Sequence, residues 1–141
     1  MSTFYRYFKE NMEALGLPAP EALFGNLQTA VTSASAILAG IDKFGTKVTI
    51  GELIGAGTRV EQLTVVSGCL AAYYFGAVIG SIAVAAARCL GRDALVSDVL
   101  ATAGRHELDR PWLEPTLRRW RTIHDNRALA RDLTRSRMLT A

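Results

Sequence analysis

The sequence predicts an all-α protein, a compact helical bundle around a long central apolar helix and an apolar helical hairpin. Two stretches, residues 22–41 and 62–87, contain no charged residue, and as helices both are long enough to form the arms of that hairpin. Most other segments carry apolar residues three and four positions apart, the period of amphipathic helices that can cover such a hairpin. Strand-like alternation is limited to residues 47–50.

The length and composition indicate a single domain over residues 1–141. Hydrophobic residues make up 50% of the chain and charged residues 21%, which is too apolar for a disordered chain and too charged for a plain polytopic membrane protein. The net charge of +3 is unevenly distributed. Residues 92–141 form a basic, helical C-terminal part that contains arginine but no lysine.

Residues 3–15 predict a short amphipathic helix that is rich in aromatic residues. Its aromatic side chains suit either a membrane interface or the cover of a hydrophobic core, and both interpretations stay open. The N-terminus lacks the apolar stretch of a Sec signal peptide. We therefore expect a protein that is soluble in the cytoplasm of the producing cell and is secreted without a Sec signal.

The first uncharged stretch, residues 22–41, mixes apolar and polar residues. As a single helix it is about 30 Å long, just enough for the hydrocarbon thickness of a membrane. Its polar side chains suit a helix that lines water or hydrogen-bonds to a partner helix. The candidate pore-lining residues of this stretch are Asn26, Thr29 and Ser33.

Residues 42–57 form a glycine-rich connection of mixed charge. The spacing of a capping box at residues 49–52 predicts a short helical turn. The same spacing at residues 58–61 predicts the start of a continuous helix that runs to Leu90 and is ended by Gly91.

Small residues form one stripe along the second uncharged stretch, residues 62–87, with most bulky side chains roughly opposite. A helix face without side chains lets another backbone come close, as in helix pairs within lipid. The predicted helix-packing residues are Gly68, Ala72, Gly76, Gly80, Ala83 and Ala87. We expect Gly76→Leu or Gly80→Leu to abolish membrane activity without unfolding the soluble form.

Two aromatic residues, Tyr73 and Tyr74, fall near the middle of the same stretch. In a lipid-facing helix, aromatic side chains are expected at the ends instead. This objection weakens if several copies assemble, because the two hydroxyl groups then point into a shared lumen. Tyr73 and Tyr74 therefore join the candidate pore-lining residues.

After Gly91 the sequence predicts amphipathic helices over residues 93–103, 111–124 and 127–139. The basic and aromatic side chains of this part suit the surface of an anionic membrane better than nucleic acid, which we do not expect as a partner. A solvated arginine face is the alternative. The candidate membrane-surface residues are Trp112, Arg118, Arg119, Trp120 and Arg121.

The sequence contains no pattern typical of a catalytic or metal site, so we expect no enzyme activity, no metal and no cofactor. His106 and His124 lack ligand-spaced partners, and Ser81 has no histidine near it in the sequence. Cys69 and Cys89 are predicted to be buried thiols, too far apart along one helix for a disulfide.

These features together resemble the small pore-forming glycine-zipper effectors of bacterial type VI secretion systems. The resemblance rests on a short domain without a signal peptide, the apolar stretch 22–41, and the row Gly68, Ala72, Gly76 and Gly80. It implies ion conduction that dissipates the potential across a target bacterium's inner membrane. It also implies self-oligomers in that membrane, and two protein partners: the tube protein Hcp in the producer and a cognate immunity protein.

Two alternatives stay open. One is a soluble all-α binding or adaptor protein, which inert liposomes and a stable complex with a cytosolic partner would favour. The other is a small resident membrane protein of holin type, which would appear in the membranes of the cell that makes it.

Overall fold

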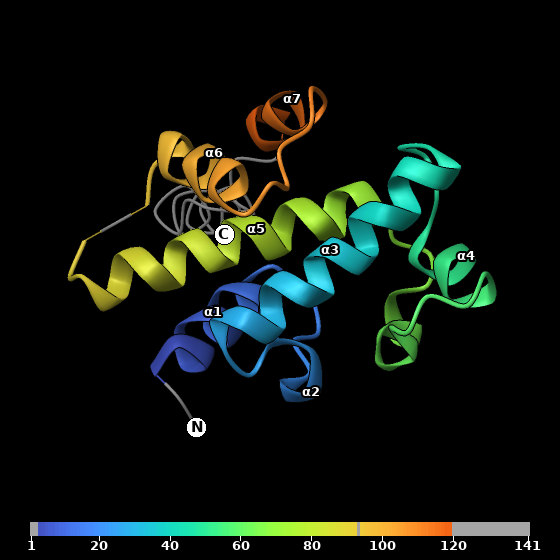
Figure 1. The fold of residues 1–141 in the computed structure, drawn as a ribbon. Helices are drawn as coiled ribbons and strands as arrows, with labels where there is room; N and C mark the ends of the chain where they lie inside the picture. The colour runs from blue at the N-terminus through green and yellow to red at the C-terminus, as the bar shows by residue number, and fades with distance from the viewer. Residues whose placement is uncertain (1–2, 93, 120–141) are drawn as a thin grey trace, which may run out of the picture.

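The computed structural model of the protein describes residues 3–92 and 94–119 (Figure 1). Over these ranges the chain forms helices joined by turns, and its extended pairing is limited to one isolated bridge between Thr49 and Leu70. The predicted all-α fold class is therefore confirmed.

A long helix, α5 (Ala71–Cys89), lies at the centre of the fold. It packs against α1 (Thr3–Ala14) and α3 (Leu27–Phe44) on one side, and against α6 (Val96–Arg105) and α7 (Leu113–Arg119) on the other (Figure 1). α3 and α5 lie side by side and run in opposite directions. They form the two arms of a hairpin-like pair, although both arms differ from the predicted ones.

The N-terminal helix α1 has the predicted amphipathic pattern. Its buried residues lie on one face of the helix: Tyr5, Phe8, Asn11 and Met12. The Phe8 ring stacks on the Phe24 ring, with 4.9 Å between the ring centroids. In this form of the protein, the buried aromatic residues of α1 therefore cover the core.

The first uncharged stretch is not one helix, contrary to the prediction. α2 (Glu21–Phe24) ends at Gly25, and α3 begins after Asn26. The side-chain oxygen of Asn26 accepts a hydrogen bond of 2.8 Å from the backbone N–H of Thr29. Such an N-cap satisfies a donor that has no partner within the helix, so Asn26 marks the start of a new helix.

The predicted continuous helix from Thr58 to Leu90 is also wrong. Residues Glu61–Val66 form a 3₁₀ helix, η1, and α5 begins only at Ala71. The capping-box spacing at residues 58–61 is not used, because no side chain caps the start of η1.

Backbone pairing with a distant segment explains this interruption. The N–H of Ile50 donates to the C=O of Cys69, and the N–H of Ala71 donates to the C=O of Val48, both at 2.9 Å. Backbone groups that are bonded across the chain cannot also continue a helical ladder. Residues 67–70 therefore connect η1 to α5.

The short helix α4 (Ile50–Gly55) confirms the other predicted capping box. The Thr49 side chain accepts from the backbone N–H of Glu52, and the Glu52 carboxylate accepts from the backbone N–H of Thr49. Gly51 lies against the end of η1, where a Cβ atom would come within 2.8 Å of the Ser67 Cβ. This close approach requires glycine at position 51.

The end of α5 lies where the sequence predicts it. Gly91 has a φ of 76°, and its N–H donates to the C=O of Arg88 at 3.0 Å. The next N–H, from Arg92, donates to the C=O of Ala87 at 3.0 Å. These two bonds form a Schellman motif, in which glycine takes the left-handed position without strain.

The C-terminal helices α6 and α7 overlap the predicted helices at residues 93–103 and 111–124. The predicted helix at residues 127–139 lies outside the described residues.

Candidate functional site

The candidate site is α5 together with the helices that cover it. In the part of the chain that the structure describes, α5 is the one helix long and apolar enough to cross a membrane. Most of it is buried, as is also found for the core helix of a soluble protein. The amphipathic helices α1, α3, α6 and α7 enclose it.

The small-residue stripe is shorter than predicted. Gly68 does not belong to it, because it precedes α5, is exposed, and would have no atom within 4 Å of an added Cβ. The other predicted helix-packing residues lie on one side of α5 and are buried: Ala72, Gly76, Gly80, Ala83 and Ala87. The stripe therefore faces the interior of the protein in this form.

The sequence does not predict the polar contacts between α1 and α5. The Asn11 side-chain amide donates to the Ser81 hydroxyl at 2.8 Å, and both residues are buried. Nearer the end of α5, Arg88 donates to the Glu10 carboxylate at 3.0 Å, and its guanidinium lies 4.3 Å from the Tyr7 ring centroid. The one sequence signal was an asparagine on the otherwise apolar face of α1.

The candidate pore-lining residues do not share one surface in this form. Asn26 caps α3, and Ser33 is buried, with its hydroxyl donating to a backbone C=O of α2 at 2.7 Å. Tyr74 is fully buried, whereas Tyr73 and Thr29 are half-buried. A lumen that these residues line requires a rearrangement of the helices, so this role stays a prediction.

The candidate membrane-surface residues differ in their surroundings. Trp112 packs edge-on against Phe75, with 5.7 Å between the ring centroids, and is half-buried. Arg118 forms an ion pair of 2.7 Å with Glu114, and Arg119 is exposed on the same helix. Trp120 and Arg121 lie outside the described residues.

The two cysteines are free thiols, and the prediction that both are buried is wrong. Cys89 is exposed at the last residue of α5, while Cys69 is half-buried beside the start of that helix. Burial raises the pKa of the Cys69 thiol. A raised pKa keeps this thiol protonated and poorly nucleophilic at neutral pH.

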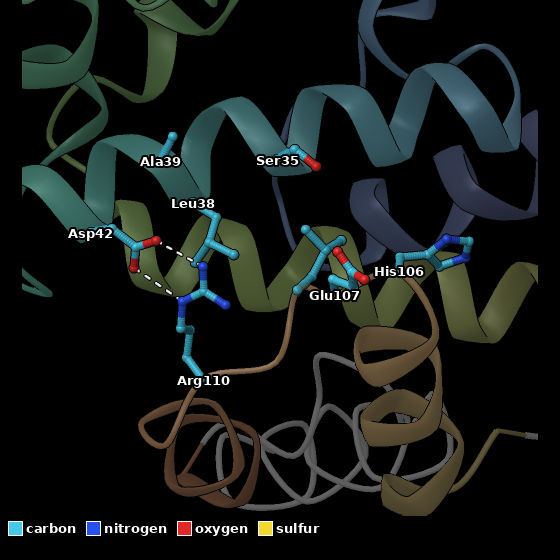
Figure 2. A pocket seen from close by; sticks show the side chains of 8 residues that line it. Ser35, Leu38, Ala39, Asp42, His106, Glu107 and Arg110 are labelled. Carbon is cyan, nitrogen blue, oxygen red and sulfur yellow. Dashed lines mark hydrogen bonds and ion pairs between the residues drawn. The ribbon is translucent and has the colours of Figure 1, made fainter.

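An open surface cavity of about 230 Å³ lies between α3 and the segment that follows α6 (Figure 2). At one end of it, Arg110 donates to both carboxylate oxygens of Asp42, from Nε at 3.1 Å and from Nη2 at 2.8 Å. These residues are 68 positions apart, so no local pattern in the sequence points to the pair. The polar lining also includes Ser35, His106 and Glu107.

The Asp42–Arg110 pair makes stability sensitive to acid. The hydrogen-bonded Arg110 guanidinium lowers the pKa of the Asp42 carboxyl below its ordinary value near 3.8. A carboxyl with a lowered pKa in the fold stabilises the protein above its unfolded-state pKa, and this stabilisation is lost as the pH falls through the folded-state pKa. Because the pair is largely exposed, we expect a contribution on the order of 0.5 kcal/mol.

Asp42→Asn should therefore lower stability at neutral pH slightly and weaken the loss of stability in acid. Thermal unfolding of both proteins from neutral pH to below the Asp42 pKa measures this difference. Glu61→Gln removes one exposed carboxylate on η1 and serves as the control. If the loss of stability in acid were the same for Asp42→Asn and for the unsubstituted protein, the pair would contribute nothing to stability.

Among the described residues, no group of three His, Cys, Asp or Glu side chains is placed to hold a metal ion. The fold and the site thus define an all-α bundle around a buried apolar helix of membrane-spanning length. No protein-family model matches the chain, and neither a curated protein nor a solved structure matches it.

Proposed function

We propose that the protein is a membrane-inserting, pore-forming antibacterial toxin, which dissipates the inner-membrane potential of a target cell by conducting ions. The observation that carries the proposal is the placement of α5, a helix of membrane-spanning length enclosed by amphipathic helices. Enclosure keeps its apolar surface away from water. The hydrocarbon of a membrane offers the same surface an equivalent environment, and the helix satisfies its own backbone groups there.

The contacts that hold the surrounding helices together around α5 are compatible with the release of α5 from them. The exposed ion pairs Arg88–Glu10 and Arg110–Asp42 each contribute at most about 1 kcal/mol. Apolar contacts supply most of the rest, and these are non-directional, so lipid chains can replace them. Release of α1 from α5 also breaks the buried hydrogen bond between Asn11 and Ser81.

The small-residue face of α5 supports assembly after insertion. Gly76 and Gly80 are one helical turn apart and allow the backbone of a second α5 to come close. In the compact form this face is buried. Insertion would expose it to other copies of the helix, which gives a physical route to self-oligomers in the membrane.

The proposed delivery follows from the resemblance to type VI effectors. In this proposal the compact form travels with Hcp from the cytoplasm of the producer, and an immunity protein protects the cells that make the toxin. Co-purification of the tagged chain with Hcp tests the route separately from pore formation. If Hcp did not co-purify with the tagged chain, the delivery route would be contradicted, but the proposal of pore formation would not.

We expect a cross-link between α1 and α5 to block ion release from liposomes. Asn11 and Ser81 touch across the two helices, so the pair Asn11→Cys and Ser81→Cys brings two thiols together. The native thiols are first removed as Cys69→Ala and Cys89→Ser. The oxidised double variant should release almost no potassium, and a reductant should restore release, because α5 can leave α1 only when the cross-link is open.

The cysteine-free parent, oxidised and reduced in the same way, gives the control release. Equal potassium release from the oxidised and the reduced double variant would contradict the separation of α1 from α5. No release by the parent from neutral or anionic liposomes would contradict pore formation altogether.

A soluble all-α binding or adaptor protein is the second candidate, and the burial of α5 favours it, since core helices of soluble proteins have similar length and composition. Inert liposomes together with a stable cytosolic complex would support this candidate. A resident membrane protein of holin type is distinguished by fractionation of the producing cells, where it would be found in the membranes.

A further inference from the structure

The cavity between α3 and the segment that follows α6 is lined by one charged side chain that has no partner among the described residues. Asp42 and Arg110 neutralise each other at one end of the cavity (Figure 2). Ser35, His106 and Glu107 also line it, and within the described residues their side chains have no hydrogen-bond or ion-pair partner. The Glu107 carboxylate, which is exposed, is therefore a negative charge at the cavity with no counter-ion among the described residues.

Glu107 occupies a backbone position that favours glycine. Its φ is 58°, and it follows α6 in a Schellman motif, in which Glu107 donates to the C=O of Gly104 at 3.2 Å and Leu108 donates to the C=O of Ala103 at 2.7 Å. The same motif after α5 uses Gly91. A side chain in the left-handed conformation adds strain that glycine avoids. Such strain is concentrated at functional sites in proteins, so its occurrence at the lining of a cavity motivates a functional hypothesis for the Glu107 side chain.

We propose that this cavity binds a protonated primary alkylamine, with the Glu107 carboxylate as the counter-ion. The Ser35 hydroxyl supplies an additional hydrogen-bond acceptor for the ammonium group. Leu38 and Leu108 are buried and line the same cavity, so they provide an apolar floor for the alkyl chain. This site is independent of the pore-forming proposal.

The size of the cavity limits the ligand. A volume of about 230 Å³ corresponds to roughly seven or eight water-sized groups. This volume has room for an ammonium group on a short alkyl chain, and it lies below the roughly 300–1,000 Å³ of typical ligand pockets. Such a group comes either from a free diamine or from a lysine side chain of a partner protein.

Titration of the ¹⁵N-labelled protein with n-butylammonium, followed by NMR, tests the site. We expect saturating shifts at residues 35–42 and 104–110, with a dissociation constant on the order of a millimolar, as suits so small a ligand. n-Butanol and butyrate match the probe in size but lack its positive charge. Equal binding of either one would overturn the proposal.

Three variants separate a binding role of Glu107 from a structural one. Glu107→Gln keeps the shape and removes the charge, so it should weaken n-butylammonium binding at least about tenfold. Glu107→Gly should also lose binding, yet raise the midpoint of thermal unfolding by about 3–5 °C, because it relieves the left-handed strain. Glu61→Gln, which removes an exposed carboxylate on η1, should change neither n-butylammonium binding nor the midpoint of thermal unfolding.

Unchanged binding by Glu107→Gln would overturn the proposal, and so would a lower unfolding midpoint for Glu107→Gly, because Glu107 would then serve the fold. Where binding is found, putrescine and an Nα-capped lysine are compared. Tighter binding of putrescine supports a free diamine as the ligand, and tighter binding of the capped lysine supports a partner's side chain.

Discussion

Replacing Tyr74 with alanine is expected to lower the free energy of unfolding by about 3–5 kcal/mol. Among the residues that the structure describes, Tyr74 is the largest fully buried side chain. Its ring centroid lies 6.4 Å from that of Phe24, and its hydroxyl donates to the C=O of Pro18 at 2.8 Å. The substitution leaves a large cavity between α5 and the N-terminal helices, and it leaves the Pro18 carbonyl without this donor.

The neighbouring residue provides a matched control. Tyr73→Ala removes an identical side chain from a half-buried position on the same helix, so it should cost clearly less. Tyr74→Phe isolates the hydroxyl and should cost about 1 kcal/mol. Urea unfolding followed by circular dichroism gives all three values. Equal losses for Tyr73→Ala and Tyr74→Ala would contradict the packing described for α5.

Replacing Gly80 with leucine is expected to lower the free energy of unfolding by about 2–3 kcal/mol, because overpacking a buried site outweighs the gain in helix propensity. Gly80 lies on the buried face of α5. The matched control is Gly68→Leu, at an exposed site with open space around the added Cβ, and it should change stability by less than about 0.5 kcal/mol. Thermal and urea unfolding measure the change in the free energy of unfolding for both variants.

This contrast changes how the stripe can be tested. The sequence alone predicts that Gly76→Leu or Gly80→Leu leaves the soluble form intact, and the burial of both glycines argues against that. Loss of liposome leakage in either variant would therefore have two explanations, a defect in assembly and a defect in folding. The reversible cross-link between α1 and α5 avoids this, because it leaves the stripe unchanged. A stable Gly80→Leu protein would contradict the interior placement of the stripe.

Local signals were sufficient for much of the fold. The apolar period of α1, the capping box at Thr49 and the stop at Gly91 all depend on residues within a few positions of one another, and the structure confirms them. The same signals identify most of α5, the element at the centre of the candidate site. Asn26 is a local signal of the opposite kind to the predicted single helix, since a polar N-cap inside an apolar stretch marks a helix start.

Other features depend on segments that are far apart in the chain. The start of α5 follows from the backbone pairing of Val48 and Ile50 with residues 69–71, which overrides the continuous helical pattern. The Asp42–Arg110 pair and the cavity beside it require α3 to lie next to the segment after α6. The left-handed Glu107 is likewise a conformation that its residue type does not predict.

By itself, the sequence determined that the protein is helical and that one long, uncharged segment lies at its centre, because helical period, capping and glycine stops are properties of neighbouring residues. Only the tertiary structure decided where that helix begins, that Gly68 lies outside its stripe, and that Tyr74 is buried while Tyr73 is half-buried. These outcomes depend on which distant backbone and side-chain groups meet, and the free energy of those contacts outweighs local preference.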